Sequence, residues 1–339
     1  MTERSGTPGV ERVAAVVERL AVLMEAGVPP ASAWGYLADQ LASSARPRAR
    51  PGRTDRGDPR VRDLVADTVT AAATAAREGR EIAAAIVGQV SATPGARTTD
   101  AGAASAWRAV AAAWHVATQT GAPLATSLRR LADAQRALGQ TQRDVAAALA
   151  GPRATSRLVA GLPLVGILFG LALGFDTVRT LFVTPPGLVC LALGTALMLL
   201  AWRWSSRMVR QATPVNASPG LVIELTAIAM ASGSSLERAI AAVDAALVTT
   251  GLAQSASQDA AAVDSVLSLS RAAGVPAGTL LRGEAEQARR DVRSAAQLGS
   301  AALATRLMLP LGVCVLPSFM LLGVAPLMLS VLSSTLSVL

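Results

Sequence analysis

The sequence predicts an all-α, polytopic membrane protein with two duplicated cytoplasmic helical-bundle modules and about three transmembrane helices. Apolar residues gather in a few long blocks. In the other segments, apolar residues recur at three- and four-residue spacing, and the two halves of the chain resemble each other. Of 339 residues, 52% are hydrophobic and 16% charged, with a mean hydropathy of +0.43. Because soluble domains carry about a quarter charged residues, we expect a membrane protein with substantial polar parts.

Residues 10–42 are expected to form a helical hairpin. Apolar residues recur at helical spacing up to Met24, Gly27 ends the first helix, and Pro29 stands where the second begins. A glycine just past one helix and a proline at the start of the next is the usual arrangement. The first ten residues are polar and lack the pattern of a signal peptide, so we expect a cytoplasmic N-terminus.

The rest of the first module, predicted to span 1–157, contains a loop and four helical stretches. Residues 43–60 combine Pro, Gly and Arg without apolar periodicity, which predicts a flexible basic loop. Gly121 ends one of the later helices, and Pro123 begins a long helix that runs to about residue 150. The helical stretches are expected at 61–78, 81–90, 103–119 and 123–150.

A transmembrane hairpin is predicted within 158–204. Residues 158–175 contain no ionisable side chain and would span about 27 Å as a helix, enough for a hydrocarbon core. A second apolar run, 187–202, follows a short loop with Arg179. Arginines flank the hairpin on its outer ends, which places both large polar segments in the cytoplasm by the positive-inside rule. These flanking residues are Arg153, Arg157, Arg203, Arg207 and Arg210.

The second module is predicted at 205–305 and a C-terminal transmembrane segment at 306–335. The apolar block 307–332 contains Pro310, Pro317 and Pro326. It is long enough for one tilted and kinked span, and a re-entrant pair of short helices is the alternative, because proline breaks a helix where protein re-satisfies the backbone.

An internal repeat supports the two-module organisation. Residues 121–136 align without a gap with 274–289, which matches Gly121 with Gly274 and Pro123 with Pro276. At a different spacing, residues 17–27 align with 223–233, which matches Gly27 with Gly233, and Glu18 with Glu224. Chance similarity among alanine-rich helices is the alternative. In the second copy, Ser234 and Glu237 fit a capping box at the start of a helix.

Charged residues also match between the two long helices. They recur at three- and four-residue spacing, and we take them as a candidate partner-binding surface; pairing within each helix, worth a few tenths of a kcal/mol per pair, is the alternative. The matched residues are Arg129, Asp133, Arg136, Arg282, Glu286 and Arg289.

No catalytic, cofactor-binding or metal-binding residues are predicted. The chain has one histidine, His115, and no lysine, so His-based metal sites, triads and a Walker lysine are excluded. Cys190 and Cys314 lie in apolar blocks and are interpreted as small hydrophobic residues. The formal charge of +8 comes without an aromatic-interleaved basic face, so nucleic acid is not an expected partner. A small polytopic transporter or another membrane scaffold remains an alternative, although the predicted spans contain no ionisable group.

The chain resembles the F-domain family of type II secretion and type IV pilus platform proteins, nearest to the integral-membrane proteins of Tad/Flp pilus systems. The resemblance rests on the hairpin motif LMEAGVPP (23–30) and on the arginine-rich helix that runs into a proline-containing apolar segment at 283–326. Both copies lack the glutamate that often precedes the long helix in pilus-type members (117–121 and 270–274), and an N-terminal pair of spans is also missing.

The resemblance implies a role without bond chemistry. It implies a multi-pass platform in the cytoplasmic membrane that couples a hexameric secretion ATPase to the extraction of pilin-like subunits. Other membrane platform components and homo- or hetero-oligomers are the further partners that it implies.

Overall fold

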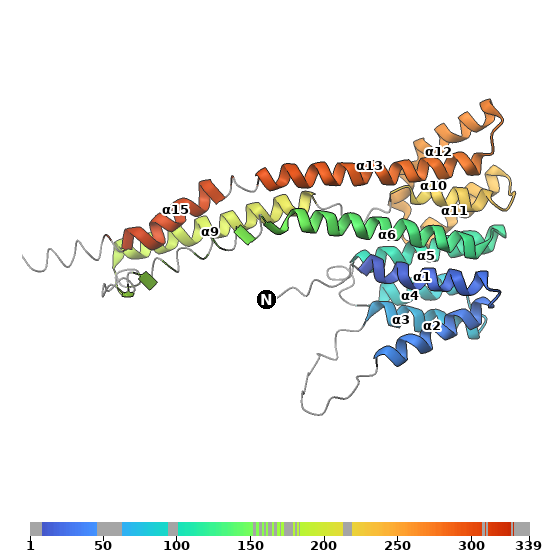
Figure 1. Cartoon of the computed structure of the whole chain (residues 1–339), viewed down its shortest axis with the longest axis horizontal. Helices are drawn as coiled ribbons and strands as arrows, with labels where there is room; N and C mark the ends of the chain where they lie inside the picture. Colours follow the sequence, from blue (N-terminus) through green and yellow to red (C-terminus); the bar gives the residue numbers. More distant parts are fainter. Residues whose placement is uncertain are drawn as a thin grey trace, which may run out of the picture. The chain divides into compact units, whose positions relative to one another are not determined.

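The computed structural model describes residues 9–45, 63–93, 101–151, 184–212, 219–306 and 311–326, together with isolated positions between 154 and 182 and residues 309 and 328. Within these residues every regular element is helical and there is no strand, which confirms the all-α class (Figure 1). The chain divides into two compact units. Unit 1 comprises Met1–Gln142 and Val215–Ser294, and unit 2 comprises Arg143–Pro214 and Ala295–Leu339.

The first part of unit 1 contains the helices expected from the sequence, within a few residues of their predicted ends. The basic loop is the exception, because α2 continues to Ala45 and so includes its first residues; the part of 43–60 beyond Ala45 lies outside the described residues. The helices are α1 (Gly9–Glu25), α2 (Pro30–Ala45), α3 (Leu64–Arg77), α4 (Ile82–Ala92), α5 (Ala101–Thr120) and α6 (Leu124–Ala148).

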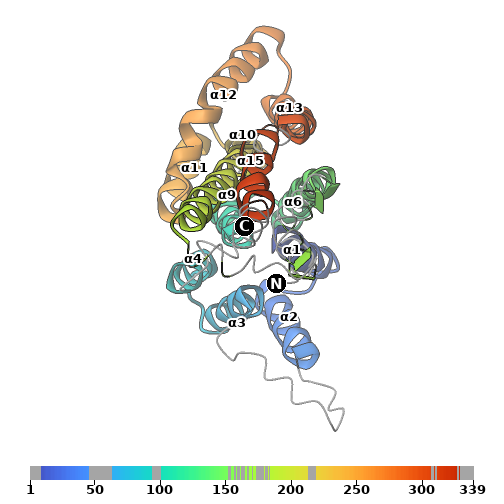
Figure 2. The same ribbon diagram turned by 90° about the vertical axis from the view of Figure 1, so that its left-hand side faces the viewer.

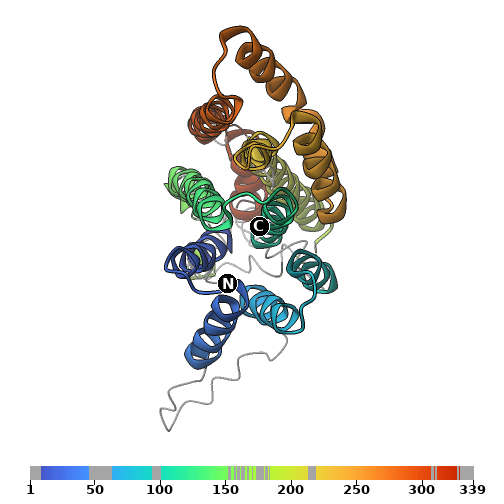
Figure 3. The ribbon, with the colours of Figure 1, turned by 90° about the vertical axis from the view of Figure 1, so that its right-hand side faces the viewer.

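The second part of unit 1 contains α10 (Leu221–Met230), α11 (Leu236–Thr250), α12 (Ala253–Ala273) and α13 (Ala277–Arg306). Nearly every residue of α10 is buried, because this short helix packs against α5, α11 and α12. A helix that is apolar all round is typically buried in this way. In Figures 2 and 3, α5 and α10 lie between the outer helices of unit 1.

One hydrophobic core joins the two predicted modules. It contains α1 and α5 residues together with Leu225 of α10 and Leu247 of α11. Trp34 of α2 inserts between Trp107 and Trp114 of α5, with ring centroids 6.2 Å and 5.8 Å away. The modules were predicted as separate domains, but they form one compact unit, because the buried faces of α10 and α11 are covered by α5.

The four glycines of the predicted hairpin turns have left-handed backbone conformations. Their φ angles are +85° at Gly27, +73° at Gly121, +79° at Gly233 and +67° at Gly274. Glycine adopts this conformation without the steric cost that a Cβ atom imposes, so it ends a helix cleanly.

The prolines after three of these turns lie one residue before their helices. The carbonyl oxygens of Pro29 and Pro123 accept hydrogen bonds from Ala33 N (2.9 Å) and Ser127 N (3.1 Å), and that of Pro276 accepts from Thr279 N (3.1 Å). Each proline therefore occupies the capping position, whose carbonyl accepts the first bond of the helix.

The start of α11 differs from the predicted capping box. Ser235, not Ser234, caps the helix, and its side chain accepts from Arg238 N at 3.4 Å. Ser234 instead donates to the carbonyl oxygen of Ala229, at 2.6 Å, near the end of α10. Its hydroxyl thus satisfies a terminal carbonyl of the preceding helix and does not cap the next one.

In unit 2, α9 (Pro185–Ala212) contains the predicted apolar run 187–202. The segment Pro185–Met208 of this helix is long enough and apolar enough to cross a membrane. No second helix among the described residues has both the length and the hydropathy. Of the run 158–175, only seven isolated positions are among the described residues. Because the other two predicted spans are not described at full length, the multi-pass topology remains a prediction.

The C-terminal segment lies against α9. It consists of η1 (Leu311–Val315), α15 (Leu316–Phe319) and η2 (Met320–Val324), so wider π-helical turns flank Pro317, which cannot donate a backbone hydrogen bond. The buried face of α9 has small residues at seven-residue spacing, namely Gly187, Gly194 and Ala201. Small residues of this kind let two helices approach closely.

Candidate functional site

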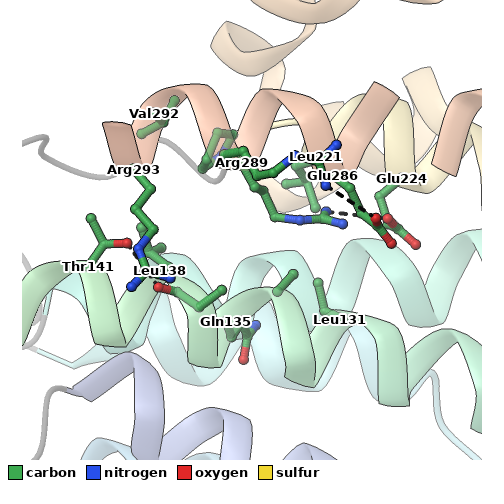
Figure 4. A pocket seen from close by; sticks show the side chains of 14 residues that line it. Leu131, Gln135, Leu138, Thr141, Leu221, Glu224, Glu286, Arg289, Val292 and Arg293 are labelled. Carbon is green, nitrogen blue, oxygen red and sulfur yellow. Dashed lines mark hydrogen bonds and ion pairs between the residues drawn. The ribbon is translucent and has the colours of Figure 1, made fainter. Parts of the chain in front are cut away.

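A cavity of about 210 Å³ lies in unit 1 between α6, α13 and the start of α10 (Figure 4). Leu131 and Leu138 of α6, Leu221 of α10 and Val292 of α13 give it an apolar wall. A second hollow of about 240 Å³ shares several of its lining residues and is mostly charged. Four of the six candidate partner-binding residues line this second hollow: Asp133, Arg282, Glu286 and Arg289.

The other two candidates, Arg129 and Arg136, turn toward α1. Arg129 pairs with Glu25 at 2.9 Å, and Arg136 pairs with Glu18. Arg136 also contacts Asp133 of its own helix at 3.3 Å. The expected pairing within one helix therefore occurs here, but the contacts to α1 join two helices that are distant in sequence. No pattern in the sequence indicated that α1 would face this side of α6.

Arg289 of α13 reaches Glu224 of α10 in the same way. Its Nη1 lies 3.3 Å from Oε2 of Glu224, and the two side chains are 20% and 5% exposed. The second carboxylate oxygen of Glu224 is buried and has no hydrogen-bond partner within the described part of the chain. A carboxylate this deeply buried depends on its one arginine, because water cannot replace the lost interaction.

The pairs Glu18–Arg136 and Glu224–Arg289 occupy equivalent positions in the internal repeat. The alignment of 17–27 with 223–233 matches the two glutamates, and the separate alignment of 121–136 with 274–289 matches the two arginines. Each alignment was made at its own spacing, yet the residues they match meet as ion pairs in space. Each pair joins the first helix of a copy to its long last helix.

A second ion pair of the first copy has no counterpart. Glu25, which binds Arg129, aligns with Ala231, so Arg282, the equivalent of Arg129, has lost its acidic partner. Arg282 and Arg130 both line the charged hollow, and neither has an ion pair or hydrogen bond to another described residue. The hollow therefore presents two guanidinium groups whose donors are available to an acidic ligand.

Gln135 is a site residue that the sequence did not reveal. It lies on α6 in the wall of the apolar cavity, is 5% exposed, and donates from Nε2 to the carbonyl oxygen of Ala106 at 3.0 Å. The signal that the sequence offered was a glutamine at a position of α6 where the helical spacing otherwise places apolar residues. Its contact fixes α6 against α5 at the floor of the site.

His115 and Asp259, two further polar residues of unit 1, make structural contacts. His115 Nδ1 lies 2.8 Å from Oε1 of Glu81, which ties α5 to the start of α4. Asp259 of α12 accepts from the backbone N–H of Val222 at 3.2 Å and so satisfies the first turn of α10. Burial raises the pKa of the Asp259 carboxyl, and this hydrogen bond opposes the shift.

Comparison of the chain with protein-family models, with curated proteins and with solved structures gives no match.

Proposed function

We propose that the chain is a non-enzymatic platform protein of the cytoplasmic membrane. In this proposal it belongs to a type II secretion-like or Tad/Flp pilus assembly machine and couples a cytoplasmic secretion ATPase to the extraction of pilin-like subunits. Both modules and the N-terminus lie in the cytoplasm, and the chain crosses the membrane several times. The modules arose by duplication of one helical unit.

The observation that carries the proposal is the equivalence of Glu18–Arg136 and Glu224–Arg289. Two sequence alignments of different spacing meet in the same contact, which chance similarity among alanine-rich helices does not explain. A duplicated helical module beside an apolar membrane segment is the organisation that the sequence resemblance implies. The equivalence therefore supports the part of the resemblance that rests on the repeat.

The two long helices suit a mechanical role. α6 has 25 residues and α13 has 30, and each begins in unit 1 and ends in unit 2, which also contains the apolar helix α9. Helices of these lengths extend for about 37 and 45 Å. A continuous helix is stiff along its axis, which suits a protein that transmits force.

The charged hollow is the proposed contact for the ATPase. Arg130 and Arg282 provide hydrogen-bond donors for carboxylates of the partner. Asp133 and Glu286, in the same hollow, fix the alignment of the partner by attracting its basic residues. Arg136 and Arg289 have a different role in this proposal, because their ion pairs hold the long helices in place.

Site-specific photo-cross-linking in native membranes tests the proposal. A photoreactive amino acid replaces Arg282, and a matched control replaces Arg238, which is exposed on α11 of the same unit. We expect the Arg282 probe to capture a secretion-type ATPase that the Arg238 probe captures far less. Mass spectrometry identifies the products.

Capture of the same proteins at both positions, or of no ATPase at Arg282 in a host that contains the machine, would contradict the proposed contact. If the purified chain instead moved a solute across liposome membranes, the transporter alternative would replace the platform.

A further inference from the structure

The part of α9 from Ala201 to Met208 has a buried side and an exposed side. Ala201 is 5% exposed and packs against Cys314 and Val315, and Met208 packs with the ends of α6 and α13. These two residues continue the seven-residue spacing of the buried stripe. The residues between them, Trp202 to Arg207, therefore include the face of α9 that points away from the rest of unit 2.

Two tryptophans and two arginines occupy that face. Trp202 is 67% and Trp204 41% exposed, and Arg203 and Arg207 are also exposed. The two arginines are four residues apart and so lie on one side of the helix. Neither makes an ion pair or hydrogen bond with any residue that the structure describes. Their charges are therefore available to an external anion.

The apolar surface of α9 continues directly into this cluster. Leu193, Leu199 and Leu200 are 54–62% exposed on the preceding turns. A tryptophan has an apolar ring and one polar N–H, so it is favoured where hydrocarbon meets headgroups. The order along α9, exposed leucines followed by tryptophans and arginines, matches the order of hydrocarbon, interface and headgroup across one leaflet.

Charge is distributed unevenly between the two units. The sequence of unit 2 contains eight arginines and two acidic residues, so it carries +6 of the formal charge of +8. Unit 1, although larger, is close to balanced. The part of the chain with the apolar helix is thus also the strongly basic part, which is the charge complement of an anionic membrane surface.

We propose that Trp202, Arg203, Trp204 and Arg207 form a binding site for the headgroups of anionic phospholipids. The inference rests on the proposed membrane location and goes beyond it, because a membrane helix need not prefer one lipid class. The guanidinium groups bind the lipid phosphates, and the indole rings lie at the hydrocarbon boundary on either side. The site enriches anionic lipid around the end of α9.

Quenching of tryptophan fluorescence in nanodiscs tests the inference on the full chain. The nanodiscs contain phosphatidylcholine and phosphatidylglycerol in fixed equal amounts, with a trace of nitroxide-labelled lipid of one headgroup or the other. The bilayer is then identical in both samples except for the headgroup that carries the quencher. The other three tryptophans, Trp34, Trp107 and Trp114, are at most 4% exposed and so do not contact lipid.

We expect labelled phosphatidylglycerol to quench at least about twofold more than labelled phosphatidylcholine, because each arginine at the surface favours anionic lipid. In R203Q/R207Q the two labels should quench equally, and R203K/R207K should restore the difference. The control R238Q/R271Q removes two exposed arginines of unit 1 and should behave as the unaltered chain.

Equal quenching by the two labels in the unaltered chain would overturn the lipid preference and leave the membrane location intact. Absence of quenching by either label would show that α9 does not lie in the bilayer, which would overturn the proposed location itself. A difference that persists in R203Q/R207Q would assign the preference to other arginines and would also refute this site.

Discussion

At the scale of single residues, the two equivalent ion pairs have very different surroundings. Glu224 and Arg289 are 5% and 20% exposed, whereas Glu18 and Arg136 are 37% and 41% exposed. Exposed pairs contribute at most about 1 kcal/mol because water and salt compete with them. Loss of one partner of a buried pair leaves an uncompensated charge and costs about 3–5 kcal/mol.

We therefore predict that R289Q destabilises unit 1 by about 2–4 kcal/mol and R136Q by less than about 1 kcal/mol. The measurement is the unfolding midpoint of the full chain in detergent, followed by the fluorescence of the buried tryptophans. The double variant E224Q/R289Q should recover part of the loss, since no buried charge remains. Equal losses in R289Q and R136Q would contradict the assigned difference in burial.

A second prediction concerns the pH dependence that Asp259 confers. Its pKa is raised from 3.8 in the folded chain, mainly by burial, so the folded state holds this proton more tightly than the unfolded state. Stability from this group is therefore present at low pH and declines as pH rises from 3.8 through the raised pKa. We expect D259N, which retains an acceptor for Val222 N, to be at least as stable as the unaltered chain at pH 7.

The measurement is the difference in unfolding midpoint between the two chains from pH 4 to 7. Converted to a free energy of unfolding, the difference should change in favour of D259N as pH rises. The change should be at most about 1 kcal/mol, because the carboxyl is only partly buried. D244N, at an exposed acidic position on α11, serves as the control. A constant difference across the range would refute the role of Asp259 titration.

At the scale of elements, close packing joins α9 to the C-terminal segment. Ser318 is fully buried and donates to the carbonyl oxygen of Gly194 at 2.8 Å. A Cβ atom at Gly194 would lie 2.5 Å from Cγ of Leu322. The small residue is therefore what allows the two segments to approach, as in other small-residue contacts between membrane helices.

We predict that G194L separates the two segments and destabilises unit 2 by about 1–3 kcal/mol, the usual cost of overpacking. The neighbouring substitution T195L, on the exposed side of α9, should have little effect. The smaller substitution G194A tests the same contact. L322A should restore part of the stability lost in G194A, because it removes the side chain that the new methyl group would meet. Thermal unfolding in nanodiscs measures these effects, and additive losses in G194A/L322A would argue against direct contact.

At the scale of the whole molecule, Cys190, which is partly exposed on α9, reports whether this helix lies in lipid, whereas Cys314 is buried within the protein. Cys190 lies in α9 and Cys314 in η1, and both thiols are free. In nanodiscs we expect a charged, membrane-impermeant maleimide to label neither within a period that labels S268C, on the exposed side of α12, completely. Both native cysteines should react after denaturation in detergent. Rapid labelling of Cys190 in the intact nanodisc would place α9 outside the bilayer.

The helical elements and most of their ends could be predicted from local sequence. Gly27, Gly121, Gly233 and Gly274 end helices in the sequence and have positive φ in the structure, because the preference of glycine for this conformation is a local property. The apolar run within α9 was equally visible, since length and hydropathy require no knowledge of neighbours. The capping box at Ser234 failed because its hydroxyl found a different acceptor in the preceding helix.

Which helices meet could not be predicted from the sequence. The matched arginines predicted a surface, but the folded chain turns Arg129 and Arg136 toward α1 and Arg289 toward α10, and it leaves Arg282 without the partner that its equivalent has. It also joins the two modules through a shared hydrophobic core. The physical reason is that helix propensity and apolar spacing act over a few residues, whereas ion pairs and burial depend on the packing of segments that lie far apart in the chain.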